Sequence, residues 1–153
     1  MRCGKKEPIK RAANGFSLIE LVLVMFIIGI VAAIALPRFA QANARQQLEA
    51  AANRVVNDLE RARHEARASS NAVAISFSTS DNSYSYASAV GTTFEMQLDE
   101  SPYQVELSKA LFNGSSNVAF NGYGMPSSNG TVTLKSNAGT VKVTLDATGR
   151  VSR

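Results

Sequence analysis

The pattern of hydrophobic and polar residues divides the chain into three segments. The first is an apolar run, FSLIELVLVMFIIGIVAAIAL, which covers residues 16–36 and contains one charged residue, Glu20. At about 1.5 Å per helical residue the run reaches about 31 Å, which matches the hydrocarbon thickness of a bilayer. A core helix of a soluble protein carries a polar stripe, and this run has none. The run therefore predicts a transmembrane helix over residues 16–37.

The second segment, residues 38–70, has the period of an amphipathic helix. Its apolar positions are four and three residues apart and share one helical face: Leu48, Ala52, Val55, Leu59, Ala62 and Ala66. Polar residues occupy the remaining faces, and among them we expect His64 to be exposed. A coiled coil is the alternative, but the segment has few heptads and little leucine. Pro37 removes a backbone donor between the two segments, so we expect a kink there if the helix continues.

The third segment, residues 71–153, changes to a period of two, which is typical of strands. Val73, Ile75 and Phe77 alternate with small polar residues. Further strands are expected over residues 84–86, 94–98, 104–108, 118–120, 131–136, 140–146 and 150–152. Glycine-containing turns between the last three ranges predict consecutive hairpins. The predicted fold class is α+β, with a long N-terminal helix packed on a C-terminal antiparallel β-sheet head.

The basic charge of the chain is concentrated at its N-terminal end. The formal net charge is +4, and residues 1–15 hold five basic side chains and one acidic one, so the rest of the chain is neutral. Basic residues in front of an apolar run keep that end of a membrane protein in the cytoplasm. We therefore expect a single membrane span with a cytoplasmic N-terminus and the head on the far side of the membrane.

The residues that carry catalytic or metal chemistry are scarce. The chain has one cysteine, Cys3, and one histidine, His64, which excludes an internal disulfide and a histidine-pair metal site. The head shows no catalytic constellation, and its Asn121-Gly122-Tyr123-Gly124 segment lacks the strand and helix context of a phosphate-binding loop. We expect no enzyme activity, no metal and no cofactor.

The charged residue inside the apolar run needs an explanation, because a membrane-embedded charge is costly and usually functional. A cleavable secretory signal has a shorter apolar region, of roughly 7–15 residues. A plain membrane anchor that lets Glu20 snorkel to the interface is the alternative that the residues alone leave open.

Residues 14–22, NGFSLIELV, resemble the type IV prepilin signature: a short basic leader that ends in glycine, then phenylalanine, and glutamate at the fifth mature position. The resemblance implies that a prepilin peptidase removes residues 1–15 by cutting between Gly15 and Phe16 and methylates the new amine of Phe16. It also implies that Glu20 neutralises the N-terminal ammonium of a neighbouring subunit during filament assembly. The implied partners are the peptidase, other pilins or pseudopilins in the filament, and the inner membrane, with the head in the periplasm.

The last part of the chain, roughly residues 115–153, resembles the ending of the H-type minor pseudopilins of type II secretion and their FimT-like relatives. The similar parts are VAFNGYGM from Val118, two short strands, and the pair Gly149-Arg150. The function favoured by this resemblance is a structural subunit of the pseudopilus that drives protein export across the outer membrane. The alternative is a minor type IV pilin that acts in pilus biogenesis or in DNA uptake.

The DNA alternative depends on two C-terminal arginines. Some FimT-like pilins bind DNA through Gly-Arg-x-Arg, whereas this chain ends Gly149-Arg150-Val151-Ser152-Arg153, with one more residue between the arginines. Because a strand has a period of two, Arg150 and Arg153 are expected on opposite faces. We therefore favour a structural role, in which Arg150 pairs with Asp146 and Arg153 belongs to a frayed terminus, and nucleic acid is the less favoured partner.

Overall fold

The computed structural model describes residues 15–88 and 91–153. Helix α1 runs from Leu18 to Ser69 and contains Pro37. The chain divides into two compact units, and the boundary between them lies between Pro37 and Arg38. The first unit contributes the apolar half of α1, and the second contains the other half of the helix with all the strands. The helix continues through Pro37, and the kink expected there stays a prediction.

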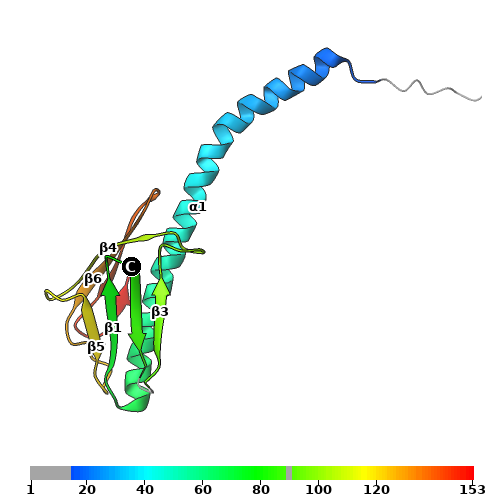
Figure 1. Cartoon of the computed structure of the whole chain (residues 1–153). Coiled ribbons are helices and arrows are strands. Elements are labelled where there is room, and N and C mark those ends of the chain that lie inside the picture. The colour runs from blue at the N-terminus through cyan, green and yellow to red at the C-terminus, as the bar shows by residue number, and fades with distance from the viewer. Residues whose placement is uncertain (1–14, 89–90) are drawn as a thin grey trace, which may run out of the picture. The chain divides into compact units, whose positions relative to one another are not determined.

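The half of α1 in the second unit packs on the head through the face that the sequence predicts. All six apolar positions of the predicted stripe are buried, together with Ala51: Leu48, Ala51, Ala52, Val55, Leu59, Ala62 and Ala66. Four of these seven residues are alanines, and their small side chains let the helix backbone approach the strands closely. Figure 1 shows strand β3 alongside this half of the helix.

In the part of the head that the structure describes, eight strands form two antiparallel sheets. The strands are β1 (Val73–Ser78), β2 (Ser83–Ala87), β3 (Thr93–Gln97), β4 (Glu106–Phe112), β5 (Asn117–Phe120), β6 (Gly130–Ser136), β7 (Gly139–Leu145) and β8 (Val151–Ser152). The first sheet has the order β3-β2-β1-β5 and the second the order β4-β6-β7-β8. The predicted fold class is confirmed, and so are the two hairpins β6–β7 and β7–β8. The division into two sheets was not apparent in the sequence.

Strand β4 differs most from its predicted range, which was 104–108. Gln104 has a φ of 53° and its backbone N–H donates to the carbonyl of Glu100, so this residue closes a turn. The strand then shows a register shift between Leu107 and Lys109. A bulge of this kind places one extra residue in the strand, so the simple alternation is interrupted and cannot be seen in the sequence.

One hydrophobic cluster joins α1 to both sheets. Tyr84 and Phe120 are buried on the first sheet, and Phe112 and Leu134 are buried on the second. The rings of Phe77 on β1 and Phe112 on β4 stack at 5.6 Å between centroids, which connects the two sheets directly. Buried residues therefore fix the helix and the sheets as one folded head over residues 38–153.

Replacing Gly130 with alanine is expected to destabilise the head by about 3 kcal/mol, because a small-to-large change in a packed core forces neighbouring groups apart. A Cβ at this position would lie 2.2 Å from the ring of Phe112 and 2.4 Å from the carbonyl oxygen of Leu111. Thermal unfolding of the full chain in detergent measures the loss. Gly29→Ala is the matched control, because a Cβ there meets nothing within 4 Å. Equal unfolding temperatures for the two variants would contradict the packing argument.

Candidate assembly and binding sites

The predicted cleavage site lies just in front of the helix. Gly15 and Phe16 precede the first residue of α1, Leu18, and the side chain of Phe16 is 81% exposed. A Cβ on Gly15 would meet nothing within 4 Å, so packing within the described chain does not require a glycine there. The rest of the predicted leader, residues 1–14, lies outside the described residues.

The apolar half of α1 exposes a hydrophobic surface along its length, with Glu20 as its one charged residue before Arg38. The exposed large side chains begin at Phe16 and continue to Phe39, and an 18-residue window of the helix has a mean hydropathy of 2.9 with no buried residue. This length and composition suit a membrane anchor. Glu20 lies in the first turn of the helix and is exposed. Its partner in another subunit stays a prediction.

The C-terminal arginines do not behave as predicted. Arg153 is held on the helix, where its guanidinium donates to Oδ1 of Asn53 at 2.9 Å and to the backbone carbonyl of Glu49 at 3.5 Å. The prediction of a frayed terminus was therefore wrong, because α1 offers acceptors beside the end of β8. In the described chain Arg150 forms no ion pair with Asp146, whose Oδ1 instead accepts the backbone N–H of Thr148.

Two other arginines connect α1 to the loops of the head. Arg67 donates to the backbone carbonyl of Tyr123 at 2.9 Å, and Arg63 donates to that of Thr148 at 3.3 Å. Close approach is possible because glycines flank these carbonyls: Gly124 has a φ of 74° and Gly149 a φ of 79°. In the sequence both arginines belong to the polar faces of the amphipathic helix. The only local signal for these two contacts is the presence of glycines in both turns, where a side chain can come close to the backbone.

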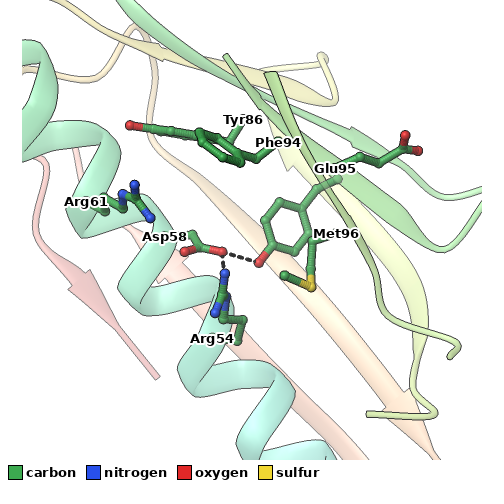
Figure 2. A pocket seen from close by; sticks show the side chains of 8 residues that line it. Arg54, Asp58, Arg61, Tyr86, Phe94, Glu95 and Met96 are labelled. Atoms are coloured by element: carbon green, nitrogen blue, oxygen red, sulfur yellow. Dashed lines mark hydrogen bonds and ion pairs between the residues drawn. The ribbon is translucent and has the colours of Figure 1, made fainter. Parts of the chain in front are cut away.

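A cleft opens between α1 and strands β2 and β3, with a cavity volume of about 120 Å³. At one end of it Asp58 accepts a bond from Nε of Arg54 at 2.9 Å and another from the hydroxyl of Tyr84 (Figure 2). Burial, followed by the hydrogen bond to Asp58, raises the pKa of Tyr84 well above its ordinary value, so the phenol stays protonated and donates. No local pattern in the sequence predicts this network, because Asp58 and Tyr84 lie on different elements.

At the other end of the cleft an arginine covers two aromatic rings. The guanidinium carbon of Arg61 lies 5.7 Å from the ring centroids of both Tyr86 and Phe94, and these rings stack at 6.1 Å. Within residues 15–88 and 91–153, no group of His, Cys, Asp and Glu side chains could hold a metal ion. The chemistry available in the cleft is hydrogen bonding and stacking.

Comparisons with known proteins agree with this architecture. The family model of type II transport protein GspH matches residues 51–149, and the model of the prokaryotic N-terminal methylation motif matches residues 10–36. Among solved structures, the type IV minor pilin FimU of Pseudomonas aeruginosa has a similar fold, with a TM-score of 0.53. The two chains are 18% identical, and the match covers 71% of this chain and 88% of that one. No curated protein matched the sequence.

A long N-terminal helix packed on an antiparallel β head, with an apolar N-terminal half, defines a pilin-like protein. The GspH model covers more than half of the chain, so the chain belongs to the GspH family of type II transport proteins. Its role is that of a minor pseudopilin or pilin, which is a structural subunit. The N-terminal methylation motif implies processing by a prepilin peptidase and assembly into a pilin-like filament.

Proposed function

We propose that this protein is a minor subunit of the type II secretion pseudopilus, the filament that drives protein export across the outer membrane. The observation that carries the proposal is the GspH match over residues 51–149, which includes most of the head. The likeness to FimU supports the fold, and its low identity does not favour the pilus.

The proposal divides the chain by role. Residues 1–15 are the cleaved leader, residues 16–37 span the inner membrane, residues 38–70 form the amphipathic helix, and residues 71–153 form the periplasmic head. The basic N-terminal end stays in the cytoplasm before cleavage, as expected for positive charge next to a span. The exposed apolar surface of α1 supports the anchor, because water cannot solvate it favourably.

Deleting the gene in its host, with and without plasmid-borne wild type, tests the secretion role. We expect the deletion to retain the exported proteins inside the cell while pili and transformation stay normal. The plasmid should restore export. The opposite pattern, with export intact and pili or DNA uptake lost, would assign the protein to the alternative machine.

The DNA alternative makes its own prediction at the C-terminus. We expect the full chain in detergent to bind duplex DNA weakly, and Arg150→Ala, Arg153→Ala to change that binding less than twofold. The reason is that Arg153 already bonds to the helix, and residues 69–153 hold five cations against six anions. A gel shift at low salt, where phosphate contacts are strongest, gives the measurement.

The matched control for charge is the double variant Arg38→Ala, Arg45→Ala, which removes two cations at another place. Tight binding by the wild type that only the Arg150, Arg153 variant abolishes would contradict the structural role of these arginines and support DNA uptake.

A further inference from the structure

The cleft between α1 and strands β2 and β3 has no role in the function proposed above. The two tyrosine hydroxyls of the cleft differ in their hydrogen bonding. The hydroxyl of Tyr84 donates to Asp58, but that of Tyr86 is buried without a hydrogen-bond partner among the residues that the structure describes. Tyr86 is only 5% exposed. A buried polar group without a partner is costly, and its retention calls for an explanation such as a ligand.

The second free donor of the cleft is Arg61. Its guanidinium lies over the rings of Tyr86 and Phe94, and a guanidinium that stacks on rings keeps its N–H groups available at its edge. Among the described residues no carboxylate forms an ion pair with it. Arg61 and Tyr86 therefore leave this end of the cleft with donors, and the group that satisfies both is a negatively charged acceptor.

The charge of the cleft limits the ligand to one such acceptor. Arg54 is neutralised by Asp58, and Figure 2 shows Glu95 pointing away from Arg61 and Asp58. The two arginines and two acids that line the cleft cancel, so a polyphosphate would meet no excess of positive charge. A cavity of about 120 Å³ has room for one side chain rather than for a chain of nucleotides.

The cleft lies next to the edge of a sheet, where a side chain of another polypeptide can enter it. Strand β3 stands at the outer edge of the sheet β3-β2-β1-β5, and Phe94 on it is 50% exposed. An exposed edge strand presents unpaired backbone groups to which an extended segment of another chain can add. Phe94 is paired directly with Tyr86 in the register of β2 and β3, and their rings stack, so the edge residue lies beside Tyr86.

We propose that this cleft docks an extended acidic segment of a partner polypeptide. The segment adds to the edge of β3 and places one aspartate or glutamate carboxylate on the Tyr86 hydroxyl and the Arg61 guanidinium. Phe94 and Met96 provide the apolar wall beside it. The site does not depend on whether the filament serves secretion or a pilus.

Fluorescence anisotropy with the full chain in detergent tests the site. The probes are the labelled strand-forming peptide TVTEVTV and its neutral twin TVTQVTV. We expect the acidic peptide to bind saturably and about tenfold more tightly than the neutral one, because hydrogen bonds to charged groups are the stronger ones. Tyr86→Phe and Arg61→Gln should each weaken the acidic peptide about tenfold and leave the neutral one almost unchanged.

Two controls match these changes elsewhere on the chain. Tyr123→Phe removes a hydroxyl from an exposed loop residue, and Arg45→Gln removes a charge from another turn of α1; neither should alter binding. Thermal unfolding separates docking from folding: Tyr86→Phe should unfold no earlier than wild type, since it removes an unpaired hydroxyl.

Three results of the binding experiment would overturn the proposal: no saturable binding of TVTEVTV, equal affinity for the two peptides, or control variants that weaken the binding of TVTEVTV as much as the cleft variants do. A fourth is a lower unfolding temperature for Tyr86→Phe than for wild type. A fifth is tight binding of the oligonucleotide dT10 that Arg61→Gln and Tyr86→Phe abolish while the peptide does not bind, which would make the cleft a base-stacking site instead.

Discussion

Co-expression with an active prepilin peptidase is expected to remove residues 1–15 completely and to leave N-methyl-phenylalanine at Phe16. The methylation motif covers this boundary, and the structure places Gly15 and Phe16 in front of the first helical turn, where no packed neighbour obstructs them. Glycine lets a peptidase approach the backbone closely, because it has no Cβ. Intact-mass analysis of the purified protein distinguishes the leader-bearing, cleaved and methylated forms.

Gly15→Leu should block this cleavage almost entirely, while Gly29→Leu, which changes a glycine inside the apolar half of α1, should be processed like wild type. Both variants keep the charge of the leader, so insertion into the membrane is equal in the two proteins. Wild-type protein that keeps its first fifteen residues beside an active peptidase would rule out the cleavage at Gly15. Cleaved Gly15→Leu protein would show that this glycine does not determine the site.

Local periodicity was sufficient to predict that the helix and the strands exist, although it placed β4 too early in the chain. The spacing of Leu48, Ala52, Val55 and Leu59 identified the buried face of α1 because a helix repeats its faces every three or four residues. Strand β1 was visible for the same kind of reason, as Val73, Ile75 and Phe77 alternate with exposed positions. The division into two sheets depends on which strands pair, and the stacking of Phe77 on Phe112 joins residues that no local pattern connects.

The same distinction applies to the candidate sites: those within one contiguous motif could be predicted, and those that join distant residues could not. Gly15, Phe16 and Glu20 belong to a contiguous motif, so the sequence alone could name them. The docked state of Arg153 could not be predicted, because its acceptor, Asn53, is a hundred residues away in the chain. The cleft could not be predicted for a similar reason: Arg61 and Phe94 lie on different elements, and no local pattern connects them.

Replacing Glu20 with valine is expected to leave membrane insertion unharmed and to reduce incorporation into the filament on the order of tenfold or more. Insertion should not suffer, because the apolar run becomes more apolar. Assembly should suffer, because the N-terminal ammonium of a neighbouring Phe16 loses its counter-charge within an apolar bundle, where an unpaired charge costs about 3–5 kcal/mol. The measurement is the amount of subunit that co-purifies with sheared filaments, relative to the amount in the membrane fraction.

Conservative variants test whether assembly needs the negative charge of Glu20 rather than the size or polarity of its side chain. Glu20→Gln keeps the shape and removes the charge, so it should assemble as poorly as Glu20→Val, whereas Glu20→Asp should recover part of the loss. Glu60→Val makes the same change on the exposed side of α1 in the head and should assemble normally. If Glu20→Gln enters the filament as efficiently as wild type, Glu20 does not act as the counter-charge, and the plain anchor with a snorkelling carboxylate becomes the correct explanation of this residue.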